Sequence, residues 1–303
     1  MADPHFADRL ATLVEGRRSR VVLGLDPDPA SLWPAAMKEV EGSEGPAANL
    51  AARAIAAHCG AAIDAAGPAC VAVKLQFACF ERLGAAGWSA LETVRDRARS
   101  AGLLVIADAK RGDVPITAHA YAQALVGSTP SPFGTIEGFG ADAITVNPLL
   151  GRDSLDPLVE AAARAGAGVF CLVNTSNDGA SDLQDFDAGG APLYERLAQL
   201  VHDIGADHVG ESGLSLVGAV TGATRPERLE RLRELMPRAI FLLPGVGAQG
   251  GDPAALGSAF APHRAAGLVA ASRSIVDAYR AGGGDPAQAA RTAAQELRAN
   301  TWN

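Results

Sequence analysis

The stretch VIADAKRGDVPIT, residues 105–117, changes within a few positions from an apolar run to a dense group of charges. The apolar, β-branched residues at its start predict a buried strand that ends near Asp108. Lys110 and Asp113 follow directly, on either side of a short Arg-Gly turn. Charged side chains just past a buried strand are typical of α/β proteins whose sites lie at the carboxyl ends of parallel strands.

Seven further short apolar runs of the same kind recur along the chain. They are RVVLGLD (20–26), CVAVKLQ (70–76), DAITVN (142–147), GVFCLVN (168–174), LVGAVTG (216–222), AIFLLPG (239–245) and GLVAAS (267–272). Segments of helical period separate them, at 47–66, 88–101, 152–165, 190–204, 226–235 and 252–262. A last helix is predicted after Asp285, with this residue as N-cap and Pro286 as the first helical residue.

Eight repeats of strand and helix predict an α/β fold, a (β/α)8 TIM barrel that forms a single domain over residues 1–303. A doubly wound open sheet is the alternative. The sixth run is the weakest, because it is rich in glycine. Two stretches are expected to be loop insertions, at 27–46 and 127–140. The second is too rich in Gly, Pro, Ser and Thr to predict regular structure, and either could cover a site as a lid.

Composition narrows the class of protein. The 303 residues are 48% hydrophobic, which allows a large core, and the net charge of −8 argues against a nucleic-acid-binding surface. Four cysteines without a C-x-x-C pair indicate reduced thiols in a cytoplasmic protein. We find neither a signal peptide nor an apolar run of membrane-spanning length. The histidines and cysteines show no metal-binding spacing, and no Gly-x-Ser-x-Gly elbow is present.

Polar residues end nearly every predicted strand, and in a barrel these positions converge on one rim. They are Asp26, Lys74, Asp108 with Lys110, Asn147, residues 174–176, the loop 244–251 and residues 272–274. Each taken alone is more often a cap or a solvated charge. Their repetition at successive strand ends favours a site.

The group at 108–113 favours acid–base chemistry. Asp108 and Lys110 are two positions apart, so an extended backbone points both to one face. Nearby carboxylates favour the ionised form of a lysine, which makes Lys110 a poor Schiff-base nucleophile and a suitable proton donor. The alternative is a structural salt-bridge cluster. The embedded Arg-Gly-Asp triplet is interpreted as chance.

The segment GVGAQGG, residues 245–251, contains the pattern G-x-G-x-x-G. It follows the seventh predicted strand, and no acidic residue ends the next strand, so a dinucleotide site is not favoured. In a barrel, glycines after strand seven can present backbone N–H groups to a phosphate. Arg273 and Gln249 could bind the same anion. A plain tight turn is the alternative.

At this point the motifs resemble a known family. DAKRGDVPIT is similar to the D-x-K-x-x-D signature of the orotidine 5′-phosphate decarboxylases, including the apolar-Pro-x-Thr that follows. LGLDPDP, VAVKLQFACFE, NTSNDGA, LPGVGAQGGD and SRSI resemble further motifs of that family, and the long loops resemble its long bacterial subgroup (type 2). The resemblance implies decarboxylation of orotidine 5′-phosphate to uridine 5′-phosphate, the last step of de novo pyrimidine synthesis, without metal or organic cofactor.

The resemblance also implies roles for single residues. Lys110 would protonate C6 as carbon dioxide departs, beside Asp108 and Lys74. Asp113 would reach, with Val114 and Thr117, into the partner's site of a homodimer. The substrate-binding set would be Asp26, Val114, Thr117, Ser176, Pro244, Gln249 and Arg273. The family usually has proline at the position of Asp178, so the resemblance does not predict the geometry of that loop.

Three other functions remain as alternatives. Hexulose-phosphate synthases and keto-gulonate-phosphate decarboxylases share the D-x-K-x-x-D barrel but use magnesium. The Val114-Pro115-x-Thr117 sequence favours an orotidine 5′-phosphate decarboxylase over these enzymes. A catalytically inactive phosphosugar-binding protein is argued against by the intact lysine and aspartates. A Schiff-base aldolase is the third.

Overall fold

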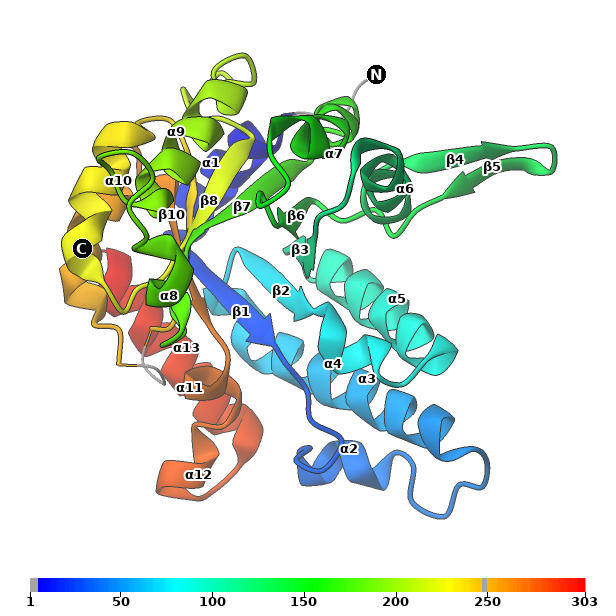
Figure 1. The fold of residues 1–303 in the computed structure, drawn as a ribbon. Coiled ribbons are helices and arrows are strands. Elements are labelled where there is room, and N and C mark those ends of the chain that lie inside the picture. The colour runs from blue at the N-terminus through cyan, green and yellow to red at the C-terminus, as the bar shows by residue number, and fades with distance from the viewer. Residues whose placement is uncertain (1–4, 247–249, 303) are drawn as a thin grey trace.

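Eight parallel strands pair side by side around a complete ring (Figure 1). The computed structural model describes residues 5–246 and 250–302. The ring runs in the order β1 (Val21–Leu25), β10 (Gly267–Ala271), β9 (Phe241–Pro244), β8 (Val217–Thr221), β7 (Gly168–Asn174), β6 (Ala143–Val146), β3 (Leu104–Arg111) and β2 (Ala72–Gln76). Because β1 pairs with both β2 and β10, the sheet is closed. The predicted (β/α)8 barrel is confirmed, and the open sheet is excluded.

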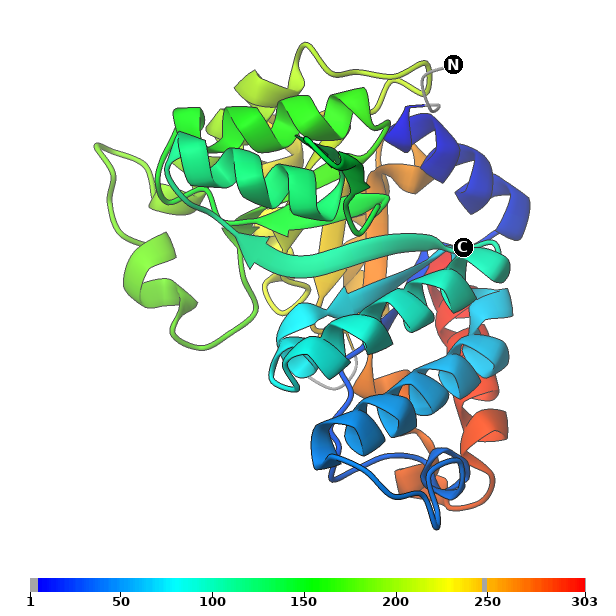
Figure 2. The same cartoon turned by 90° about the vertical axis from the view of Figure 1, so that its right-hand side faces the viewer.

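Helices connect the strands and surround the ring (Figures 1 and 2). The longer ones are α1 (Phe6–Arg17), α3 (Ala47–Ala66), α5 (Ala85–Ser100), α6 (Pro115–Leu125), α7 (Arg152–Arg164), α9 (Leu193–Gly205), α10 (Leu229–Leu235) and α13 (Pro286–Trp302). Short helices are α2 (Pro34–Lys38), α4 (Phe77–Glu81), α8 (Ala180–Gln184), α11 (Arg273–Val276) and α12 (Tyr279–Gly282). Short 3₁₀ segments are η1 (Gly67–Ala69), η2 (Pro226–Arg228), η3 (Pro253–Phe260) and η4 (Arg264–Ala266).

Two helix predictions have instructive outcomes. The carboxylate of Asp285 accepts a hydrogen bond of 2.8 Å from the backbone N–H of Gln288, which confirms the predicted N-cap of α13. The helix expected at 252–262 is instead the 3₁₀ segment η3. Gly257 within it and Pro262 just after it both disfavour a regular α-helix.

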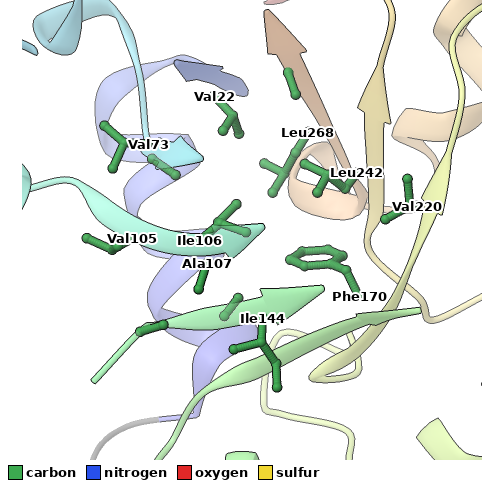
Figure 3. Packing of buried hydrophobic residues seen from close by; sticks show 14 of the residues in the cluster. Val22, Val73, Val105, Ile106, Ala107, Ile144, Phe170, Val220, Leu242 and Leu268 are labelled. Atoms are coloured by element: carbon green, nitrogen blue, oxygen red, sulfur yellow. The ribbon is translucent and has the colours of Figure 1, made fainter. Parts of the chain in front are cut away.

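Alternation along each strand separates the core from the site. Ile106, Phe170 and Leu242 point into the ring, where their side chains pack against one another (Figure 3). Two positions further along the same strands come Asp108, Leu172 and Pro244, which line a cavity at the carboxyl ends. The same side of the sheet therefore provides the apolar core below and part of the cavity lining above.

The glycine-rich sixth strand forms as predicted, and its glycine has a packing role. A Cβ atom added at Gly218 would lie 2.9 Å from the ring of Phe170, and 2.4 Å from the carbonyl oxygen of Ile240. Glycine at this position therefore makes room for the ring of Phe170 inside the barrel.

The third strand differs from its prediction, which ended it at Asp108. It continues to Arg111, which pairs with Val146 of β6, and the pairing shifts between Ala107 and Arg111. The charged motif thus begins inside a bulged strand, and bulges are often found beside active sites.

The insertion at 27–46 packs against the outside of the barrel. It contains α2, and the buried Trp33 donates its backbone N–H to Nδ1 of His58 on α3 (3.1 Å). None of its residues lines the cavity in the described part of the chain. The prediction that it could be a lid is not supported.

The insertion at 127–140 was expected to lack regular structure, and this prediction is wrong. It forms an antiparallel hairpin of β4 (Ser128–Ser131) and β5 (Gly134–Glu137), which projects from the barrel beside α6 (Figure 1). Its base is tied to the carboxyl end of α6 by the bonds from Phe139 N–H to Ala124 O and from Ala141 N–H to Leu125 O. The hairpin follows a helix instead of a strand, so it lies toward the amino-terminal end of the barrel and does not cover the cavity.

Candidate active site

One cavity of about 750 Å³ opens at the carboxyl ends of the strands. The predicted residues that line it are Asp26, Lys74, Asp108, Lys110, Asn147, Ser176, Pro244 and Arg273. Gly24 belongs to its wall, where a Cβ atom would lie 2.8 Å from Cβ of Ser272. The predicted convergence of polar strand ends is confirmed for these residues.

A row of alternating charges crosses the floor of the cavity from β1 to β3. Lys74 on β2 places its amine 3.5 Å from the carboxylate of Asp26 and 2.7 Å from that of Asp108. The amine of Lys110 lies 2.6 Å from the second oxygen of Asp108. Charges of opposite sign thus alternate in the order Asp26, Lys74, Asp108, Lys110, and each stabilises its neighbours.

Asp108 is the centre of this row. Its Oδ2 accepts hydrogen bonds from Lys74 (2.7 Å) and from the side-chain amide of Gln76 (3.3 Å). Its Oδ1 accepts from Lys110 (2.6 Å) and from the hydroxyl of Thr145 (2.8 Å). Donors from three adjacent strands therefore hold one buried carboxylate in a single orientation.

Burial and the neighbouring charges have opposite effects on the pKa values of Asp108 and Lys74. Desolvation favours the neutral forms, but the facing lysines outweigh it and hold the pKa of Asp108 well below its usual range. Desolvation likewise opposes the charge of Lys74, while Asp108 and Asp26 raise its pKa above the usual range. Both groups are therefore ionised across the neutral pH range.

Lys110 differs from Lys74 in its exposure and in its backbone. Its side chain is 43% exposed, whereas that of Lys74 is only 10% exposed. Its φ angle is +48°, a left-handed conformation that residues other than glycine seldom adopt. Simple alternation of an extended strand is thus not what brings Lys110 to Asp108, because the bulge turns the lysine over the carboxylate. Strain of this kind often accompanies function.

Arg273, the first residue of α11, also lines the cavity and follows β10, the neighbour of β1 in the ring. No hydrogen bond or ion pair engages its guanidinium within the described part of the chain. Gly245, with φ of +96°, lines the cavity beside it, and its carbonyl accepts the N–H of Gly251 (3.1 Å), which closes the base of the loop. Gln249, predicted to bind the same anion, lies outside the described residues, as does Gly247 of the glycine pattern.

Three predicted site residues do not line this cavity. Asp113, Val114 and Thr117 lie where β3 leads into α6, and the carboxylate of Asp113 accepts the N–H of Val114 (2.8 Å). Val114 is exposed. Asp178, the departure from the family pattern, is exposed and also lies outside the cavity lining.

Several residues of the cavity were missed from sequence. Thr145 is the polar residue of β6, and Gln76 is the last residue of β2, so a polar residue at or next to a strand end is the signal that could have identified both. Leu183 and Gln184 on α8, and Arg196 on α9, also line the cavity. Their segment folds back over the strand ends, and no local pattern predicts this.

The described residues contain no group of three or more His, Cys, Asp or Glu side chains arranged to hold a metal ion. Both oxygens of Asp108 are already engaged by lysines. Among the same residues, no helix combines the length and the apolar character needed to cross a bilayer.

The closed barrel and its charged cavity define a TIM-barrel enzyme. A model described as the Orotidine 5′-phosphate decarboxylase / HUMPS family matches residues 19–293. The chain therefore belongs to the orotidine 5′-phosphate decarboxylase / HUMPS family.

Individual relatives agree with this assignment. A protein of Rhodopirellula baltica named orotidine 5′-phosphate decarboxylase is 42% identical over 278 residues, which cover 91% of this chain and 89% of the relative. One of the same name from Haloarcula marismortui is 43% identical over 276 residues, covering 90% and 87%. The solved structure of Leishmania donovani OMP decarboxylase is 31% identical, superposes with a TM-score of 0.69 and covers 100% of both chains.

Proposed function

We propose that this protein decarboxylates orotidine 5′-phosphate to uridine 5′-phosphate and carbon dioxide, as the last step of pyrimidine nucleotide synthesis. The observation that carries the proposal is the row Asp26, Lys74, Asp108, Lys110, which shares one cavity with Arg273. The names of the relatives support the same activity.

The reaction requires a proton donor beside a developing carbanion. The bond between C6 and the carboxylate carbon breaks, carbon dioxide leaves, and the electron pair stays on C6. An N–H proton of Lys110 then moves to C6, and the exposed amine regains a proton from solvent. Asp108 lies against the departing carboxylate, and Asp26 with Lys74 binds the ribose hydroxyls and aligns the charges.

Magnitudes indicate which interaction matters most. Two like charges about 4 Å apart repel by about 4 kcal/mol at an effective dielectric of about 20. Enzymes lower barriers by up to about 23 kcal/mol in typical cases, so repulsion from Asp108 supplies only a fraction. The larger share comes from charge stabilisation that grows as the carbanion forms, and the fixed ammonium of Lys110 provides it.

The other end of the cavity binds the phosphate. Arg273 can donate two parallel hydrogen bonds to it, and the N–H groups of the loop that begins at Gly245 can add further donors. Gln249 would complete this set, while Ser176 and Pro244 contact the pyrimidine. Binding energy from the phosphate then orients the base over Lys110.

The proposed active form is a homodimer with shared sites. Asp113, Val114 and Thr117 do not line their own cavity, which is the arrangement expected if they complete the partner's. The helices α6 and α7 lie side by side (Figures 1 and 2), and four large apolar residues at or just before their amino ends are exposed. They are Val114, Ile116, Leu149 and Leu150, and burial of exposed apolar residues of this size favours association.

We further propose a cytoplasmic location. All four cysteines are free thiols, and burial raises the pKa of Cys70 and of Cys171 to about 12. Thiols that remain unpaired are typical of a reducing compartment.

The activity is tested by mixing purified protein with orotidine 5′-phosphate in the presence of EDTA and following the loss of orotate absorbance. We expect full turnover, because the proposed mechanism uses no metal. Turnover that stops with EDTA and returns with magnesium would instead support the sister activities of the family. Absence of turnover under both conditions would contradict the proposal.

Lys110→Ala should lower kcat by several orders of magnitude while changing affinity for the product little. The reason is that the proton donor and the fixed positive charge are lost together. The matched control is Lys38→Ala, which removes an exposed lysine of α2 outside the cavity. Near-normal turnover of Lys110→Ala would contradict the assignment of the proton donor.

A further inference from the structure

Thr145 occupies a buried position on β6 between the two groups that carry the chemistry. It is only 1% exposed and lines the floor of the cavity. Its hydroxyl donates to Oδ1 of Asp108 (2.8 Å) and accepts the backbone N–H of Lys110 (3.0 Å). One oxygen atom therefore contacts the side chain of one proposed catalytic residue and the backbone of the other.

The bond to the Lys110 N–H falls at the strained point of the bulge. Between Ala107 and Arg111 the regular pairing of β3 with β6 is shifted, so the N–H of Lys110 finds the hydroxyl of Thr145 as its acceptor. A left-handed φ angle at a lysine is strained and persists only when surrounding contacts impose it. The Thr145 hydroxyl is such a contact.

The second bond orients Asp108. Its Oδ1 faces Lys110 and Thr145, while its Oδ2 faces Lys74 and Gln76. Thr145 is the donor from β6, and without it the carboxylate would be held from β2 and β3 alone. Rotation of the carboxylate would also move the amine that it binds.

We propose that Thr145 is a positioning residue for the decarboxylation. Its hydroxyl maintains the left-handed turn at Lys110 and the orientation of Asp108, so that the ammonium lies where C6 develops charge. Thr145 itself transfers no proton and contacts no reacting atom. This inference rests on the proposed function for its kinetic consequence, and on geometry alone for its effect on Lys110.

The kinetic test compares Thr145→Val, which keeps the shape and removes both hydrogen bonds, with Thr145→Ser, which keeps them. A misplacement of about 1 Å can cost about 100-fold, so we expect kcat of Thr145→Val to fall by about 10- to 100-fold with little change in KM. Thr145→Ser should retain most of the activity. Active-site concentrations are normalised by the stoichiometry of uridine 5′-phosphate binding.

Thr221→Val is the matched control. Thr221 is fully buried near the carboxyl end of β8, outside the cavity lining, and its hydroxyl has no hydrogen-bond partner among the described residues. Removal of the Thr221 hydroxyl should leave kcat unchanged. If Thr145→Val does not fold, Thr145→Ala is compared with Thr145→Ser instead. Equal kcat values for the variant without the hydroxyl and for Thr145→Ser would overturn the proposal.

A second readout needs no substrate. The chain contains three lysines, Lys38, Lys74 and Lys110, so amine labelling can be followed at each by peptide mass spectrometry. In Thr145→Val we expect Lys110 to label several-fold faster relative to Lys38, because its contact with Asp108 is loosened. An unchanged ratio would overturn the positioning role. Inactivity of the wild type on orotidine 5′-phosphate would overturn the proposed function instead. The labelling ratio would still test whether Thr145 positions Lys110.

Discussion

At the scale of single residues, the choice of lysine at two positions is informative. Arginine predominates among the cations of this chain, yet the two cations in contact with Asp108 are both lysines. An ammonium can give up a proton, whereas a guanidinium remains charged in proteins. Lysine is required at 110 if this position donates the proton. At 74, a compact ammonium fits between the carboxylates of Asp26 and Asp108.

Arg273→Ala should mainly raise KM, by about 10- to 100-fold, because a charged donor pair to the phosphate is lost. Steady-state kinetics on orotidine 5′-phosphate measure the change. Arg280→Ala is the control, since Arg280 is paired with Asp277 and does not line the cavity. A large fall in kcat with unchanged KM would contradict a role in phosphate binding.

At the scale of elements, the contact between the first insertion and α3 depends on a buried neutral histidine. The side chain of His58 accepts the backbone N–H of Trp33 and packs edge-on against its ring, with centroids 5.4 Å apart. Burial lowers the pKa of His58 to about 4, with Asp277 opposing and Arg280 adding to the effect. The insertion is therefore held most firmly when this histidine is uncharged.

This predicts a loss of stability in mild acid. The unfolded chain binds a proton at His58 below about pH 6.5, whereas the folded chain does so only near pH 4. Stability from this group is complete above pH 6.5 and falls as the pH decreases toward 4, by about 2 kcal/mol at pH 5.

Urea unfolding at pH 7.5 and pH 5 of the wild type and of His58→Asn measures this difference. Asparagine keeps an acceptor for Trp33 but does not titrate, so the variant should lose less stability between the two values. His119→Gln, at an exposed position of α6, should behave as the wild type. Identical pH dependence in His58→Asn and the wild type would show that His58 is not the responsible group.

At the scale of the whole molecule, the shared sites of the proposed dimer allow a complementation experiment. Lys110→Ala and Asp113→Ala should each be inactive alone. In a mixed dimer, one site combines Lys110 of the Asp113→Ala chain with the intact Asp113 of the other chain. Random pairing then restores about one quarter of wild-type activity, since about half of the dimers carry one complete site.

Co-expression of the two variants, followed by activity measurement, provides the test. The control is co-expression of Lys110→Ala with the double variant of both positions, which contains no complete site in any pairing. If the mixture is no more active than its components, Asp113 does not act across the interface.

The sequence alone determined the barrel, the charged row of the cavity and Arg273. Buried parallel strands are nearly continuous apolar runs, so all eight were recognisable, and a barrel requires their carboxyl ends to meet. Because of that requirement, the sequence predicts that Asp26, Lys74, Asp108 and Arg273 share one cavity, as they do in the structure.

Only the tertiary structure decided the contacts that depend on pairing between distant segments. The bulge in β3 arises from its register with β6, and the hydroxyl of Thr145 meets Lys110 and Asp108 from another strand. The hairpin at 127–140 likewise forms through cross-strand pairing that its composition conceals. Local propensity and periodicity report each segment's own preference, whereas register and side-chain contacts depend on which partner the completed barrel places beside it.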